Sequence, residues 1–214
     1  DHPSFGHAII SRVLENAGYR VAILSQPDWR SAEPFREFGK PRLGFLVTAG
    51  NVDSMVAHYS VSRRRRNYDY YSPAGKTGLR PDRACIVYSN RIREAYGDIP
   101  IILGGLEASL RRFAHYDYWE DRMRRSILID SRADLLTYGM GENIILRIAS
   151  LLSRGVPVRK IRDVRGSCYV CPASEKEVHY PVAAEFDWNI LKKGGRPYAD
   201  AFAAQYREQD AISG

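Results

Sequence analysis

The amino-acid sequence predicts an α/β fold, an open and mostly parallel Rossmann-like sheet with helices on both faces. Two patterns lead to this prediction. Short apolar runs of strand length alternate with amphipathic helical segments along most of the chain. Several of these runs end in glycine-rich turns, as strands that feed helices often do. Apolar residues make up 44% of the 214 residues, which is sufficient for a real core.

The elements are expected in a regular order. The first helix is predicted at 7–17, because its apolar residues recur on one face and Gly18 follows. Strands are expected at 20–24, 42–48, 99–105 and 133–139. Helices are expected at 32–38, in a short stretch ending at His58, and at 82–96, 107–112 and 141–155. The first helix needs a preceding strand to join the sheet, and we expect that strand upstream of Asp1.

Two regions depart from this alternation. Residues 59–80 have no clean period and contain proline, glycine and four consecutive arginines, so we expect a long functional or mobile loop. After residue 155 the pattern weakens, with strands expected in "SCYVC" and "VHYPV" and a polar helical segment from 183 to 214. We therefore expect a Rossmann-like domain at 1–155, and at 156–214 a small appendage and linker toward a further domain.

Composition limits the classes of function. The net charge of +7 permits nucleic acid or another anionic partner without requiring one. No run approaches the roughly 18 apolar residues of a membrane span, so no membrane partner is expected. Three cysteines, Cys85, Cys168 and Cys171, do not suggest a disulfide framework. A bacterial cytoplasmic protein fits these features best.

Ligands of doubly wound sheets bind beyond the carboxyl ends of the strands, so the turns that follow the strands are the candidate site. None of these turns contains a GxGxxG fingerprint or a Walker-type GxxxxGK[ST] loop, which argues against phosphate binding of those kinds. The turn glycines could equally serve geometry alone, and this alternative stays open. No Ser-His-Asp or Cys-His arrangement follows from the spacing, so no catalytic residue is predicted in this chain.

The stretch 104–142 has the most unusual composition. It combines His115 and several aromatic residues with nearby carboxylates and with the crowded arginines Arg111, Arg112, Arg122, Arg124 and Arg125. One interpretation is a lid or docking surface over the carboxyl edge of the sheet, because arginine pairs with phosphate or carboxylate and aromatic rings stack. The other interpretation is an internal ion-pair lattice, in which the arginines are neutralised by Asp117, Glu120, Asp121 and Asp130.

Two shorter motifs each allow two interpretations. The block Arg63–Arg66 has no acidic residue near it before Asp69 and is followed by tyrosines, which fits either an RNA-binding module or a solvated loop. Cys168 and Cys171 form a lone CxxC, whereas structural zinc needs four ligands. We expect both cysteines to be small packing residues, and no metal site is predicted.

Long segments of the chain are peculiar enough to indicate a family. They are "DHPSFGHAIISRVLENAGYRVAILSQPDWR", "VTAGNVDSMVAHY", "RPDRACIVYSNRIRE", "IILGGLEASLRRFAHYDYWEDRMRRSILIDSRADLLTYGMGE", "DVRGSCYV" and "FAAQYREQDAISG". Together they closely resemble the N-terminal region of the YgiQ-type radical SAM proteins. The resemblance implies a bacterial enzyme whose downstream domain, a partial (β/α) barrel, holds a [4Fe-4S] cluster through CxxxCxxC cysteines and binds S-adenosylmethionine (SAM) at the open iron. This chain contains no CxxxCxxC, so it resembles an accessory domain that covers or shapes the active site and whose partner is that downstream domain.

The same region resembles cobalamin-binding-type domains, with one departure. Where such domains carry DxHxxG, this chain reads Asp1-His-Pro-Ser-Phe-Gly6, with Pro3 in the place of the histidine and His2 one residue early. Cobalamin with a lower histidine ligand is therefore not expected, whereas binding without that ligand, or no cobalamin, stays open. The residues expected to bind a cofactor or substrate are Ser4, Gly6, Thr48, Gly50, Asn51, Gly104, Gly105, Glu107, Gly139 and Glu142. Those expected to contact the catalytic domain or an anionic substrate are Arg111, Arg112, His115 and Tyr116.

Overall fold

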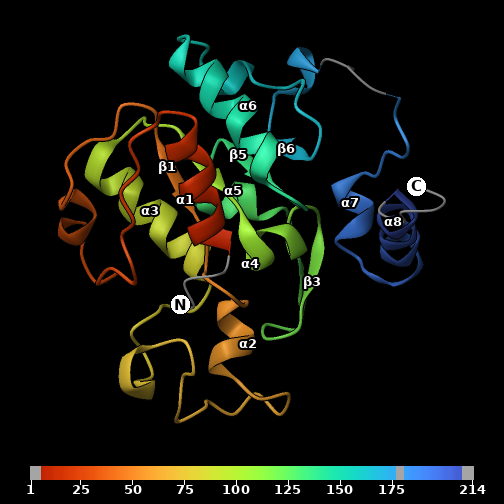
Figure 1. The fold of residues 1–214 in the computed structure, drawn as a ribbon. Helices are drawn as coiled ribbons and strands as arrows, with labels where there is room; N and C mark the ends of the chain where they lie inside the picture. The colour runs from red at the N-terminus through yellow and green to blue at the C-terminus, as the bar shows by residue number, and fades with distance from the viewer. Residues whose placement is uncertain (1–5, 177–180, 209–214) are drawn as a thin grey trace.

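The computed structural model describes residues 6–176 and 181–208 and confirms the predicted α/β class (Figure 1). Its main sheet has the order β1-β2-β5-β6. Strands β1, β2 and β5 run parallel, and β6 runs antiparallel to β5. The strands predicted at 42–48, 99–105, 133–139 and in "SCYVC" are confirmed in shorter form as β1 (Phe45–Val47), β2 (Ile101–Leu103), β5 (Leu135–Thr137) and β6 (Ser167–Tyr169).

The helices agree closely with the predicted periodicity. In the described part of the chain they are α1 (Gly6–Asn16), α2 (Ser54–His58), α3 (Ala84–Tyr96), α4 (Gly105–Leu110), α5 (Ile127–Ser131), α6 (Glu142–Ser153), α7 (Trp188–Leu191) and α8 (Gly195–Glu208). The segment predicted at 32–38 is a short 3-10 helix, η1. The 3-10 helices are η1 (Glu33–Arg36), η2 (Pro73–Gly75), η3 (Val158–Lys160) and η4 (Ala173–Glu175). α5 lies in the stretch 104–142, where no helix was predicted beyond 112.

Side chains of the sheet alternate between two cores, because successive strand residues point to opposite faces. Ile101 and Leu103 of β2 are fully buried in a cluster with residues of α3 and α5. Ile102, between them, packs with Leu135 and with Ile148 of α6 on the other face. α1 packs against α6 in a third, smaller cluster. Helices therefore cover both faces of the sheet, as the prediction required.

The strand predicted at 20–24 is wrong. This segment takes part in no strand pairing, although its apolar sequence suits a buried strand. Val21 packs on the α1–α6 cluster and Leu24 on the main core, while Ile23 is 49% exposed. A strand is stabilised by hydrogen bonds to a neighbouring strand, and this segment pairs with none of the described strands. β1 is accordingly the edge strand of the described sheet.

A hairpin was also missed by the sequence analysis. β3 (His115–Asp117) and β4 (Arg122–Arg124) pair antiparallel in a separate two-stranded sheet. The blue helices α7 and α8 form a small unit on the side of the molecule where β3 lies (Figure 1). The Arg125 guanidinium lies 5.3 Å from the Trp188 ring centroid. Helix is thus confirmed within 183–214 for the described residues, whereas most of the strand predicted in "VHYPV" lies outside them.

The long loop 59–80 is anchored to the carboxyl edge of the sheet by a buried ion pair. Arg80 and Asp69 have side chains that are each 1% exposed, with an N···O distance of 3.1 Å. Arg80 also donates a hydrogen bond of 3.0 Å to the carbonyl of Ala49, just after β1. The buried charges are paired and hydrogen-bonded, which is the condition under which burial of a charge is tolerated.

Candidate functional site

The turns after β1 and β2 meet at the carboxyl edge of the sheet. Thr48 Oγ1 accepts a hydrogen bond of 3.2 Å from the backbone N–H of Gly50. Gly105 has a φ of +78°, and a Cβ placed there would lie 2.4 Å from Thr48 Oγ1. A Cβ on Gly104 would lie 3.3 Å from the hydroxyl of Thr137, the last residue of β5. The conformation and the close approach of the β1 turn require glycine at 105, so fold geometry accounts for this glycine without a ligand.

Asn51 lies in the same β1 turn, and its side-chain amide lacks a partner. Both its nitrogen and its oxygen are buried and make no hydrogen bond to the described residues. Buried polar atoms are normally satisfied by protein, ordered water or a ligand. Asn51 is therefore the predicted site residue with the clearest requirement for an additional polar partner.

Exposed apolar side chains border this edge. Leu106 and Leu110 on α4 are 47% and 60% exposed, and Met140, which follows β5, is 81% exposed. α4 begins directly after β2, and β2 and β5 are neighbouring parallel strands, so these side chains follow adjacent strand ends. We call these three residues the apolar rim. Grouped apolar exposure of this kind is typical of a contact surface.

Glu107 is directed into the fold rather than toward solvent. Its side chain is buried, with the whole residue 1% exposed. One carboxylate oxygen accepts hydrogen bonds from the N–H and the hydroxyl of Ser54, at 2.8 and 2.6 Å, and the other accepts from the N–H of Cys85 at 2.9 Å. Ser54 and Cys85 lie in the first turns of α2 and α3, where helix N–H groups favour a negative charge. Glu107 thus joins α2, α3 and α4, and cofactor binding by it stays an untested prediction.

The two arginines at the end of α4 also turn toward the protein. Arg111 forms an ion pair with Asp53, the N-cap of α2, whose side chain is 2% exposed. The Arg112 guanidinium lies 4.8 Å from the ring centroid of Tyr138, and it donates a hydrogen bond of 2.6 Å to the carbonyl of Ser109. Sequence reasoning missed Asp53 and Tyr138. An acidic residue directly before a short helix is the signal that could have identified the cap.

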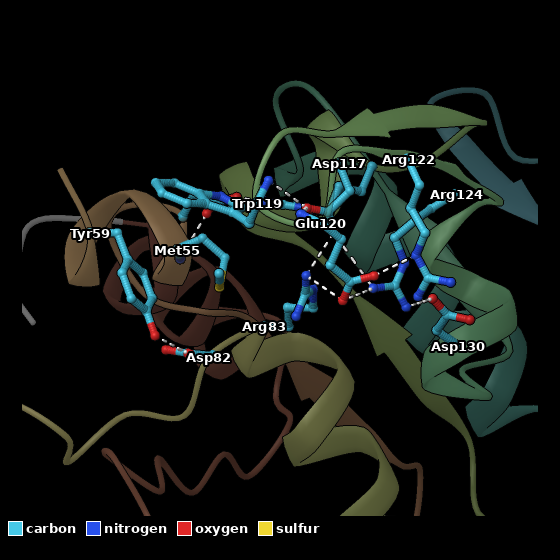
Figure 2. Close-up of polar contacts among 12 residues, drawn as sticks. Met55, Tyr59, Asp82, Arg83, Asp117, Trp119, Glu120, Arg122, Arg124 and Asp130 are labelled. Atoms are coloured by element: carbon cyan, nitrogen blue, oxygen red, sulfur yellow. Dashed lines mark hydrogen bonds and ion pairs between the residues drawn. The ribbon is translucent and has the colours of Figure 1, made fainter. Parts of the chain in front are cut away.

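The hairpin contains the ion-pair lattice that was one of the two interpretations of 104–142. Figure 2 shows the Glu120 carboxylate between Arg83 and Arg124. Its ion pairs with these two arginines have N···O distances of 2.7 and 3.1 Å. Arg83 also contacts Asp117 at 2.8 Å, and Arg124 contacts Asp130 at 2.7 Å. Burial raises the pKa of Asp117, but hydrogen bonds from Arg83 and from the backbone N–H of Glu120 outweigh it, so the pKa falls below its usual value. Asp117 therefore stays charged at neutral pH.

His115 and Tyr116 of β3 have different surroundings. Burial lowers the pKa of His115, whose Nδ1 lies 3.1 Å from the carbonyl of Phe113. Tyr116 is 44% exposed, and its hydroxyl donates a hydrogen bond to Asp121. Tyr116 is thus available at the surface, whereas His115 is half-buried and neutral at neutral pH.

The other predicted residues are spread along the edge. Gly6 and Glu142 are the first residues of α1 and α6, and Gly139 follows β5 with a φ of +73°. Ser4 lies outside the described residues. The structure therefore brings Thr48, Gly50, Asn51, Gly104 and Gly105 together in the turns after β1 and β2. Gly6 and Glu142 begin separate helices, and Gly139 lies in the turn after β5.

No ligand set for a metal is present in the described part of the chain. Within residues 6–176 and 181–208, no group of three or more His, Cys, Asp or Glu side chains could hold an ion. Cys85, Cys168 and Cys171 are free thiols. Burial raises the pKa of Cys168 to about 12. A [4Fe-4S] cluster therefore finds no fitting ligands among these residues, and we derive no step through one. None of the described helices combines the length and the apolar character needed to cross a bilayer.

A cavity of about 510 Å³ opens at the opposite, amino edge of the sheet. Its lining includes Arg93, Asp134 and Arg159. The Arg93 guanidinium is engaged by Asp134 at 2.7 Å and by backbone carbonyls, so its charge is largely used within the protein. The cavity lies away from the predicted carboxyl-edge site and gives that site no support.

Comparisons with known proteins place the chain in a family. A family model described as radical SAM N-terminal matches residues 1–214. The chain is 53% identical over 214 residues to a UPF0313 protein of Clostridium perfringens, covering 100% of this chain and 32% of that protein. It is 53% identical over 214 residues to a UPF0313 protein of Clostridium botulinum, of which it covers 33%. The chain thus spans about a third of the length of these relatives. No solved structure gave a significant match.

Proposed function

The chain belongs to the radical SAM N-terminal family, and from this premise we propose that it is an accessory domain that closes one side of the active site in a bacterial radical SAM protein. The [4Fe-4S] cluster and SAM belong in this proposal to the rest of the polypeptide and supply the radical chemistry there. The residues of this chain would exclude water and offer polar contacts at the boundary of the substrate pocket.

The observations that support this proposal are the apolar rim on the segments that follow β2 and β5, and the unpartnered amide of Asn51 in the turn after β1. Leu106 and Leu110 lie on α4, Met140 follows β5, and the relatives are about three times as long as this chain. Burying such a rim against another part of the polypeptide is favourable by about 25 cal/mol per Å² of apolar surface. The same contact would place Asn51 at a boundary where a backbone group, a water or the substrate satisfies it.

Hydrogen exchange of the full-length protein tests the orientation. Leu106→Asp with Leu110→Asp places two charges in the proposed contact, so amides of α4 and of the turn 139–141 should exchange faster, and so should one segment of the downstream polypeptide. The control is Ile129→Asp on α5, a side chain 41% exposed beside the amino-edge cavity. If the rim variant changes exchange only within α4 itself, the carboxyl edge does not face the rest of the protein.

Cobalamin without a histidine ligand stays a separate prediction. Five of the six residues in its Asp1–Gly6 frame lie outside the described residues, and fold geometry already explains Gly105. Anaerobic titration of the full-length protein with cobalamin decides it through the visible spectrum. An unchanged spectrum removes cobalamin from the proposal without affecting the accessory role.

A further inference from the structure

Two segments far apart in sequence form one basic and aromatic surface. The first is the start of the long loop, residues 59–66, and the second is the tip of the β3–β4 hairpin, residues 117–121. The hydroxyl of Tyr118 donates a hydrogen bond of 2.6 Å to the carbonyl of Val61, which joins the two segments directly. We call this the loop–hairpin surface.

A row of aromatic rings on this surface has a guanidinium group at each end. The Arg63 guanidinium lies 4.6 Å from the Tyr118 ring centroid, and Tyr118 meets Trp119 at 5.3 Å. Trp119 in turn lies 5.3 Å from the Tyr59 ring, over which the Arg65 guanidinium sits at 5.7 Å. Three aromatic residues are therefore flanked by two cations, an arrangement suited to stacking with further flat rings.

The arginine block makes no direct ion pair with the described residues, which sets it apart from the paired arginines of the core and hairpin. Arg65 is linked to the Asp82 carboxylate only through the Tyr59 hydroxyl. All four residues Arg63–Arg66 are exposed, and none forms an ion pair with a carboxylate of the described residues. The nearest hairpin acids are already engaged. Glu120 is held by Arg83, Arg122 and Arg124, and Asp121 accepts from Tyr116.

The block is also fixed in shape rather than a free run of charge. The N–H of Ser60 donates to the carbonyl of Arg64 at 2.9 Å, and the N–H of Arg63 donates to the carbonyl of Ser60 at 2.9 Å. The N–H of Arg66 donates to the carbonyl of His58 at 2.7 Å. A surface whose groups are already ordered loses less conformational entropy on binding.

We propose that the loop–hairpin surface binds a single-stranded nucleic acid. Consecutive arginines match the repeated phosphates of such a strand, and the exposed face of Tyr118, which is 43% exposed, offers a base a stacking partner. A phosphorylated side chain of a protein carries a single phosphate and would not require four exposed guanidinium groups beside a row of rings. This activity is independent of the accessory role proposed above.

Fluorescence anisotropy with the full-length protein tests the proposal. The probes are a labelled single-stranded RNA of mixed sequence, DNA of the same sequence and heparin, a polyanion without bases. The test variant changes Arg63, Arg64, Arg65 and Arg66 to Gln. The control removes the same charge elsewhere through Gln at Arg12, Arg20, Lys40 and Arg42, which are all exposed.

The block variant should bind the strand at least about tenfold more weakly, and its slope of log affinity against log salt should fall by about 2 to 3. The control variant should stay within about twofold of wild type. Tyr118→Ala should weaken RNA binding about tenfold and leave heparin binding unchanged, whereas Tyr118→Phe keeps the ring and should stay close to wild type. RNA favoured over DNA, or the reverse, identifies the natural strand.

Three outcomes overturn the proposal. The wild-type protein fails to bind either strand, or both charge variants weaken binding equally, or heparin and RNA lose affinity equally with Tyr118→Ala. If the surface instead docks the downstream polypeptide, the wild-type protein would not bind RNA. Hydrogen exchange in the downstream polypeptide would then be faster in the block variant than in wild type. Circular dichroism checks that each variant is folded. A variant that loses SAM chemistry but still binds RNA would bear on the proposed accessory function and would leave the nucleic-acid proposal unchanged.

Discussion

Glu107→Gln distinguishes a structural carboxylate from a ligand-binding one. One carboxylate oxygen accepts two hydrogen bonds from Ser54, and the amide nitrogen that replaces it cannot accept either. Hydrogen bonds to a charged group contribute about 1.5–3 kcal/mol each. The hydroxyl of Ser54 can rotate to accept from the new amide, so about one bond is recovered. The free energy that holds α2 and α3 closed should therefore fall by about 3 kcal/mol, or roughly 150-fold in the opening equilibrium.

Hydrogen exchange measures this loss locally in the full-length protein, where global unfolding need not be two-state. The amides of Ser54, Cys85 and the following turns should exchange roughly 150-fold faster in the variant. Glu142→Gln, at the first residue of α6, is the matched control, because no hydrogen bond or ion pair to the described residues involves its side chain. That control should change exchange by less than about threefold. Equal exchange in the Glu107 variant and wild type would refute the structural role and favour a ligand.

Three further predictions follow from the same structure. Asp69→Asn leaves the Arg80 guanidinium buried without its carboxylate partner. The free energy that keeps the loop 59–80 folded should fall by about 3–5 kcal/mol, as measured by hydrogen exchange and proteolysis of the loop. Gly105→Ala should destabilise the protein by about 1–3 kcal/mol because of its φ and its contact with Thr48, and adding Thr48→Ala should restore part of this in a thermal unfolding assay. Because the pKa of His115 is lowered in the folded protein, the imidazole binds a proton more readily in the unfolded chain. The contribution of neutral His115 to the free energy of unfolding is therefore complete above the ordinary pKa of 6.5 and is lost as the pH falls below 6.5. NMR titration of the imidazole and the urea midpoint as a function of pH check this, with His115→Asn removing the effect.

Periodicity predicted most of the fold because it reports local burial. The helix α6 shows apolar residues on one face in the sequence, and Ile145 and Ile148 are indeed buried there. The segment 20–24 shows the limit of this reasoning, since an apolar run becomes a strand only when another strand is beside it. The strand β3 shows the opposite case, in which a strand forms without an apolar run. Its sequence "HYD" is too short and too polar to predict a strand, and β3 is a strand because the turn at residues 118–121 lets it pair with β4.

The candidate site was less predictable, since burial of charged residues depends on contacts between distant segments. Glutamate is rarely fully buried, so residue type alone argued against placing Glu107 inside the fold, where it is 1% exposed. Its partners, Ser54 and Cys85, lie 53 and 22 residues away. Asn51 could be placed at the carboxyl edge from the position of β1 alone, whereas its lack of a hydrogen-bond partner could be found only from the three-dimensional arrangement.

The ion-pair lattice within 104–142 is compatible with the nucleic-acid surface proposed above. The ion-pair lattice of Asp117, Glu120 and Arg124 neutralises most of the hairpin arginines, so these arginines do not themselves form a free anion site. By doing so it fixes the hairpin tip, and the tip carries Tyr118 and Trp119 toward the arginine block. Fixed rings and free guanidinium groups are what a stacking surface requires, because each ordered group would otherwise lose entropy on binding. In the proposed nucleic-acid surface the lattice would therefore contribute to recognition through position rather than charge.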